Sequence, residues 1–96
     1  MIRHVALFKW KPTFPATQRR EWQDRLRALP DTIEVLRALS VGEDVLHGER
    51  SWDAAVVADV DSLDDLPTYL QHPEHRAVAE ISAPHLEHLV IVDFPA

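Results

Sequence analysis

Residues 54–60 read AAVVADV, and this stretch decides the fold. It is rich in valine and alanine, a composition typical of a β-strand. Side chains of a strand point alternately to the two faces of a sheet, so every second residue from Ala54 to Val60 shares one face. Ala55 and Val57 lie on the opposite face and are apolar as well. The stretch therefore predicts a strand that needs cover on both faces.

The segment HLEHLVIVDF at residues 85–94 is also apolar on both faces of its expected strand. Leu89 and Ile91 lie on one face, and Val90 and Val92 lie on the other. An antiparallel sheet with helices on one side only would carry polar residues on its free face. Burial of an aliphatic side chain contributes about 1.5–3 kcal/mol, so an exposed apolar face is unfavourable. We therefore expect a second copy of the chain to cover it in a symmetric homodimer. The same face is also a candidate wall for a ligand cavity.

The other segments complete the order β-α-β-β-α-β within a single domain, residues 1–96. The fold class expected from this order is α+β and ferredoxin-like, a four-stranded antiparallel sheet with helices on one face. The expected strands are 2–10 (IRHVALFKW), 35–43, 54–60 and 85–94, and the expected helical segments are 16–30, 61–70 and 73–82.

Local signals place the helix ends. The first helix begins near Ala16, has an apolar stripe, and is expected to end at Pro30, which lacks the N–H and clashes with the preceding turn. Asp61 or Ser62 is expected to cap the second helix. Pro73 is expected to start a new helical turn.

Composition excludes several classes of function. The net charge of −6 argues against nucleic-acid binding, which needs a clustered positive face. The chain has no cysteine, and with two isolated glycines it has no phosphate-binding glycine loop. It contains neither an apolar run of membrane-spanning length nor a signal-peptide pattern, so a cytoplasmic protein without membrane contact is expected.

The stretch TYLQHPEH, Thr68–His75, gathers several groups able to move a proton. The His75 imidazole can accept a proton at neutral pH, and a bend at Pro73 can bring it over the same pocket as Tyr69. The alternative is a helix junction in which Tyr69 is a half-buried core ring. His72 and His75 could also hold a metal, but no third ligand is fixed by the spacing, so no metal is expected.

His4 lies in the alternating pattern of the first strand, on the same side as Ala6 and Phe8. This position fits a hydrogen-bonded core histidine, and it equally fits a polar group in a mostly apolar ligand cavity. His85 and His88 fall in the last expected strand, where their spacing would place them on opposite faces.

Three motifs in this order resemble the stress-responsive α/β-barrel (Dabb) domain family: HVALFKWK, DSLDDLPTYLQHPEHRAV and LVIVDF. The resemblance runs from Ile2 to Phe94. It implies a ferredoxin-like monomer whose sheet pairs with that of a second copy to form a dimeric α+β barrel.

The resemblance also implies candidate site residues. A plant polyketide cyclase of this family, which forms olivetolic acid without a cofactor, uses a histidine as general base and a tyrosine to hold its substrate. Those residues match His75 and Tyr69, and its histidine on the first strand matches His4. Leu26 and Leu86 stand where the cyclase has aromatic residues, so the resemblance does not extend to the cyclase's substrate.

Two classes of function follow. The first is a small dimeric Dabb protein that holds an apolar or aromatic small molecule in its barrel and acts on it without a cofactor, with His75, Tyr69 and His4 as catalytic residues. The second is a non-catalytic stress-associated binding or assembly protein. A cofactor-independent monooxygenase is a third reading, based on the related antibiotic-biosynthesis proteins that share the barrel.

Overall fold

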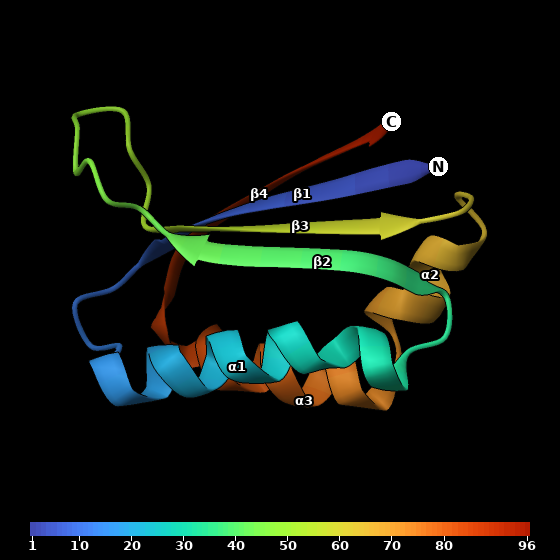
Figure 1. Cartoon of the computed structure of the whole chain (residues 1–96). Coiled ribbons are helices and arrows are strands. Elements are labelled where there is room, and N and C mark those ends of the chain that lie inside the picture. The colour runs from blue at the N-terminus through green and yellow to red at the C-terminus, as the bar shows by residue number, and fades with distance from the viewer.

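The structure is a computed structural model that describes residues 1–96. One sheet lies against a layer of helices, and the order of strands and helices along the chain is the expected one (Figure 1). The elements are β1 (Ile2–Trp10), α1 (Ala16–Thr32), β2 (Leu36–Glu43), β3 (Ala54–Val60), α2 (Asp65–Leu70), α3 (Pro73–Ser82), a 3-10 turn (Ala83–His85) and β4 (Leu86–Pro95).

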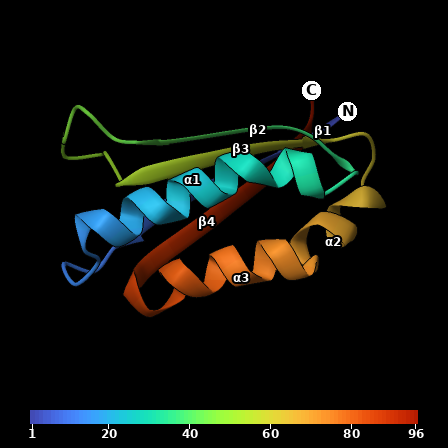
Figure 2. The same ribbon diagram turned by 60° about the horizontal axis from the view of Figure 1, so that its bottom comes forward.

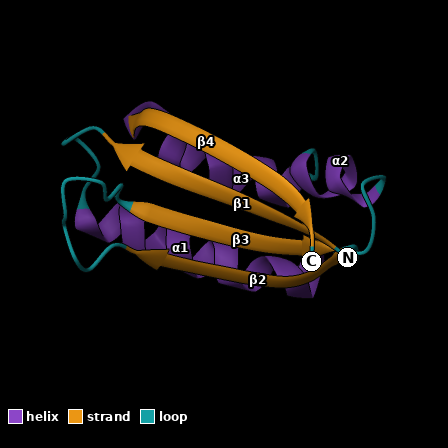
Figure 3. Ribbon diagram, turned by 90° about the horizontal axis from the view of Figure 1, so that it is seen from above, coloured by secondary structure: helices purple, strands orange, loops and turns teal.

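The sheet is antiparallel throughout, with the strand order β2-β3-β1-β4. β1 lies in the centre, where Ile2 pairs with Val60 of β3 and with Pro95 of β4. All the helices cover one face of the sheet, and the other face is open (Figures 1 and 3). The two termini meet, since the Ala96 N–H donates to the Met1 carbonyl over 2.9 Å. This arrangement confirms the ferredoxin-like prediction.

The core lies between the sheet and the helices. The predicted apolar stripe of α1, which consists of Trp22, Leu26 and Leu29, is buried there, and Ala58 and Val60 of β3 are fully buried as well. Aromatic rings fill the end near the start of α1, with ring centroids 4.8–6.5 Å apart in mostly edge-to-face pairs, a geometry that aromatic rings prefer. These rings belong to Phe8, Trp10, Phe14 and Trp22.

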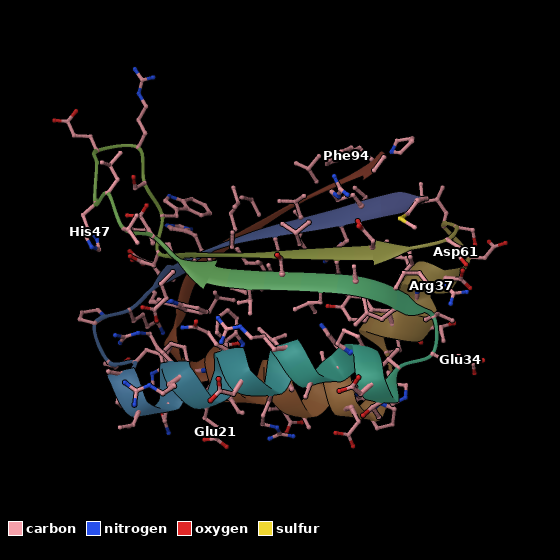
Figure 4. All side chains as sticks on the ribbon, in the orientation of Figure 1. Glu21, Glu34, Arg37, His47, Asp61 and Phe94 are labelled. Atoms are coloured by element: carbon pink, nitrogen blue, oxygen red, sulfur yellow. The ribbon has the colours of Figure 1, made fainter.

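The open face of the sheet is apolar in its middle, as β3 and β4 predict. Leu7, Val90 and Val92 lie there with 41%, 47% and 60% of their surfaces exposed. Figure 4 shows Phe94 on the side of the sheet away from the helices. The loop between β2 and β3 also rises on this side (Figure 1). The isolated chain therefore leaves an uncovered apolar surface.

The first helix runs past its predicted end. α1 continues through Pro30 to Thr32, so the prediction that it stops at Pro30 is wrong. Proline removes only its own N–H bond, and Pro30 lies so near the end that little helix remains to be broken. The Ile33 N–H still donates to the Leu29 carbonyl over 2.8 Å, on the far side of the proline.

The start of α2 also differs from the prediction. The helix begins at Asp65, and Asp64 at its N-cap position makes no side-chain cap bond. Asp61 instead pairs with Arg37 of β2 over 2.8 Å, where the two side chains lie side by side in Figure 4. The Ser62 hydroxyl donates to the Asp65 side chain over 3.3 Å. Neither predicted residue caps the helix, because both belong to the turn that precedes it.

Two smaller boundaries differ. β2 begins at Leu36 rather than at residue 35, and β4 begins at Leu86, so His85 lies in the 3-10 turn and not on the strand. The prediction that His85 and His88 lie on opposite faces of one strand is therefore wrong. No helix of the chain has the length and apolarity that crossing a membrane would need.

Candidate functional site

The three predicted site residues come from three different elements and meet at one place. His4 lies on β1, Tyr69 on α2 and His75 on α3. The ring of Tyr69 stands between the other two, with centroid distances of 6.2 Å to His4 and 4.7 Å to His75. All three line a cavity of about 280 Å³ between the sheet and the helices.

The rest of this cavity is apolar. Twelve of its 15 lining residues are hydrophobic, and none is lysine, arginine, aspartate or glutamate. The only hydroxyl besides Tyr69 belongs to Ser82, and it donates to the Ala79 carbonyl over 3.1 Å. A site of this size with few polar groups is typical of small-molecule binding sites. Without a counter-ion in its walls, it suits an uncharged ligand.

The cavity opens between β4 and α3. Both elements contribute lining residues, among them Leu89 and Ile91 of β4 and Ala79 of α3. Leu89 and Ile91 face the helices, yet they remain 41% and 47% exposed. β4 is an outer strand of the sheet, and in Figure 2 it is visible between α1 and α3. A ligand can therefore enter from this edge.

The HPEH sequence forms the junction between α2 and α3. His72 has an extended backbone (φ −61°, ψ 136°), and its Nδ1 accepts the Glu74 N–H over 3.1 Å, which caps α3. Pro73 is the first residue of α3, where its missing N–H has no helical partner to lose. The helix then brings His75 into the cavity. The stretch is both a helix junction and the support of a site residue.

The tautomer of His75 follows from its hydrogen bond. Its Nδ1 lies 2.9 Å from the Leu70 carbonyl, which can only accept, so Nδ1 carries the proton and Nε2 keeps a free lone pair. Burial lowers the pKa of His75, although the bond to Leu70 raises it; His4 and His72 lower it further. The ring is therefore neutral at pH 7 and has the form that a general base needs.

Tyr69 has a different role. It is 1% exposed, so it is more deeply buried than the half-buried ring predicted, and its hydroxyl makes no hydrogen bond within the protein. Burial raises the pKa of Tyr69 above its ordinary value of 10.0, so the ring stays a neutral phenol. A neutral phenol both donates and accepts a hydrogen bond, which suits it to anchor a ligand.

His4 has a partner that the sequence did not reveal. Its Nδ1 lies 2.6 Å from the Asp93 carboxylate, directly across the β1–β4 pair. The alternation in LVIVDF gives Asp93 the helix-facing side, but only the register of β4 against β1 places it opposite His4. Trp10 Nε1 is the one fully buried side-chain nitrogen or oxygen without a partner. The Nε2 atoms of His4 and His75 also have no partner in the protein, but they are not fully buried, so they are accessible.

The site is not inside a barrel formed by the open face. That face has its own depression of about 850 Å³, bordered by the β2–β3 loop, and none of the three predicted residues lines it. His4 points toward the helices because it shares the side of β1 that carries Ala6 and Phe8. The candidate site therefore lies on the helix-covered face and not on the face expected to form a cavity wall, and the alternation alone could not assign it to either face.

The remaining histidines have structural contacts. His85 bonds to Thr13 over 2.9 Å and stacks on Phe14, whereas His88 stacks on Trp52. His47, in the β2–β3 loop in Figure 4, takes positive φ (54°). No three histidine, aspartate or glutamate side chains gather closely enough to hold a metal ion.

Comparisons with known proteins agree with this architecture. A curated protein of Streptomyces coelicolor, described as uncharacterized, is 34% identical over 79 residues, which cover 80% of this chain and 81% of that protein. The crystal structure of a dimeric ferredoxin-like protein of unknown function from Thermobifida fusca is 39% identical, with a TM-score of 0.89 over 99% of this chain and 90% of that one.

A third protein is similar in fold alone. Hydroxynitrile lyase from Passiflora edulis is 17% identical, with a TM-score of 0.82 over 97% of this chain and 90% of that chain. The family model described as Stress responsive A/B Barrel Domain (Dabb) matches residues 2–96, nearly the whole sequence. The chain therefore belongs to the stress-responsive A/B barrel family.

Proposed function

We propose that this Dabb protein binds a small, uncharged apolar or aromatic molecule between its sheet and its helices and acts on it by acid–base chemistry without a cofactor. His75 is the general base, Tyr69 anchors a polar group of the ligand, and His4 is the second polar contact. The observation that carries the proposal is that these three side chains, from β1, α2 and α3, line one otherwise apolar cavity.

The chemistry follows from the states of the three groups. Neutral His75 presents the lone pair of Nε2, which can remove a proton from a carbon next to a carbonyl group or from a hydroxyl group. The Tyr69 phenol can donate a hydrogen bond to the oxygen on which negative charge develops. Apolar walls exclude water and strengthen this interaction. The Passiflora relative with this fold is a lyase, so the fold is compatible with an enzyme.

We also propose that the active form is a homodimer joined through the open sheet face. The dimeric relative from Thermobifida fusca supports a homodimer in this family. The apolar face of Leu7, Val90 and Val92 supports the sheet as the contact, since this surface would otherwise meet water. Because the cavity lies on the opposite face of the sheet, each subunit keeps its own site.

Proton abstraction can be measured without knowledge of the natural substrate. Incubation with benzylacetone, an uncharged aryl ketone, in deuterated buffer should place deuterium on the carbons next to the carbonyl, as NMR detects. His75→Ala should reduce this exchange at least a hundredfold, the lower end of a general base's contribution. The matched control is His47→Asn, which changes an exposed histidine and suits its positive φ.

Exchange at the wild-type rate in His75→Ala would remove His75 as the base. Binding of benzylacetone without any exchange in the wild type would instead favour the non-catalytic binding protein. The dimer should remain intact in His75→Ala, because His75 lies on the helix side of the sheet.

A further inference from the structure

The contact between His4 and Asp93 has the features of a positioning interaction. The Asp93 carboxylate lies 2.6 Å from His4 Nδ1, and His4 is its only side-chain partner, since no lysine or arginine pairs with it. The other strand pair of this kind, Arg3 with Asp59 on the open face, joins two full charges. A carboxylate that serves only one buried histidine is a familiar way to fix an imidazole.

We propose that Asp93 is a positioning residue of the cavity: its carboxylate holds the Nδ1–H of His4, so that the Nε2 lone pair of His4 faces the cavity as a second acceptor beside that of His75. What this inference says about the ligand rests on the proposed function. What it says about the position of the proton on His4 does not. It makes the site a pair of histidines, each held through Nδ1 by a different anchor, a carboxylate for His4 and the Leu70 carbonyl for His75.

This arrangement predicts the kind of ligand that fits. A carboxylate oxygen accepts hydrogen bonds, so a neutral His4 bound to it must carry its proton on Nδ1. Both accessible imidazole nitrogens of the site are then acceptors, and among the lining side chains only the Tyr69 hydroxyl and the Trp22 indole N–H are donors without a partner in the protein. Such a site favours ligands with hydroxyl groups over ligands of the same shape without them. We therefore infer an uncharged alcohol or phenol as ligand or product.

The strand register explains why Asp93 can hold this position. Asp93 lies directly opposite His4 in the antiparallel β1–β4 pair, and both side chains point to the helix side. His4 is 5% exposed, whereas the Asp93 side chain is 33% exposed at the edge of the sheet. Water can therefore solvate the carboxylate while its bond orients the buried ring.

The tautomer of His4 can be measured directly by ¹⁵N NMR of the ligand-free protein. We expect Nδ1–H in the wild type and a shift toward Nε2–H in Asp93→Asn, because the asparagine amide can donate to Nδ1. Asp93→Ala, which removes the partner entirely, serves if the first variant folds poorly. The control is Asp61→Asn, which loses a carboxylate paired with exposed Arg37 and should leave His4 unchanged.

A matched pair of probes tests the consequence for binding. Wild-type protein should bind para-cresol more tightly than para-xylene, which has a methyl group in place of the hydroxyl. In Asp93→Asn the preference should fall by about three- to tenfold, the equivalent of one hydrogen bond. The affinity for para-xylene should not change.

The outcomes separate the two proposals. Nε2–H on wild-type His4, or an unchanged tautomer in both Asp93 variants, overturns the inference about Asp93. A shifted tautomer with an unchanged preference between the probes overturns His4 as an acceptor in the cavity. If the wild type binds neither probe although the tautomer shifts as expected, the proposed function fails and the positioning of His4 by Asp93 stands.

Discussion

Burial and hydrogen bonding act on His75 in opposite directions, and burial has the larger effect. The pKa of His75 is lowered from 6.5 in the folded protein. The unfolded chain, with the ordinary pKa, therefore binds more protons in the window just below 6.5, so the free energy of unfolding falls as the pH drops through it. In the same window the neutral, proton-accepting form of His75 persists to lower pH than in an exposed histidine.

We predict that the NMR titration midpoint of His75 lies below the ordinary histidine pKa of 6.5. The dependence of stability on pH between about 5 and 7, around the ordinary histidine pKa, should also be weaker in His75→Asn than in the wild type. Urea denaturation at a series of pH values measures it. A midpoint for His75 at or above 6.5 would contradict the assignment of a neutral base.

Two substitutions of Tyr69 can separate the contribution of its ring to stability from the contribution of its hydroxyl to ligand binding. Tyr69→Phe removes a hydroxyl that has no partner in the protein, so the free energy of unfolding should stay within about 1 kcal/mol of the wild type. Binding of para-cresol should nevertheless weaken. Tyr69→Ala should cost about 3–5 kcal/mol, because it leaves a cavity in the core. Equal para-cresol affinity in Tyr69→Phe and wild type would show that the hydroxyl does not contact the ligand.

At the scale of elements, the junction between α2 and α3 combines two functions in four residues. His72 caps α3, whereas His75, one turn later, lines the cavity. We predict that His72→Ala lowers the free energy of unfolding by about 1 kcal/mol through loss of the cap. His72→Asn should restore most of it, since asparagine is a good N-cap residue. Probe binding should change little in either variant; a large loss in both would assign His72 to the site.

The elements themselves were largely predictable, because their signals are local. The alternation in AAVVADV and the stripe of Trp22, Leu26 and Leu29 each depend on neighbouring residues. The errors at Pro30 and at the start of α2 concern helix ends, where packing and turn geometry compete with cap preferences. Asp93 could not be assigned, since its role depends on a strand pairing across almost the whole chain.

At the scale of the molecule, the two apolar faces of the sheet serve different purposes. The alternating apolar residues show that both faces of the sheet need to be covered. They do not show on which of the two faces a cavity remains. The helices leave Leu89 and Ile91 of β4 41% and 47% exposed, and the site lies at this edge, between β4 and α3. The other face is left for the second subunit in the proposed dimer.

We predict that Val92→Asp on the open face converts the dimer to monomers, because it would place a charge in the apolar contact between sheets. Light scattering coupled to size-exclusion chromatography measures the mass. Leu63→Asp is the control, since Leu63 is 63% exposed in the turn before α2 and should not affect the dimer. A Val92→Asp dimer as stable as the wild type would place the contact elsewhere.

The most direct test of the account is a crystal structure of the protein with para-cresol. We predict the ring between the sheet and α3, with its hydroxyl within hydrogen-bond distance of Tyr69 and of Nε2 of His4. A cavity filled by side chains, or para-cresol bound only on the open face of the sheet, would contradict it.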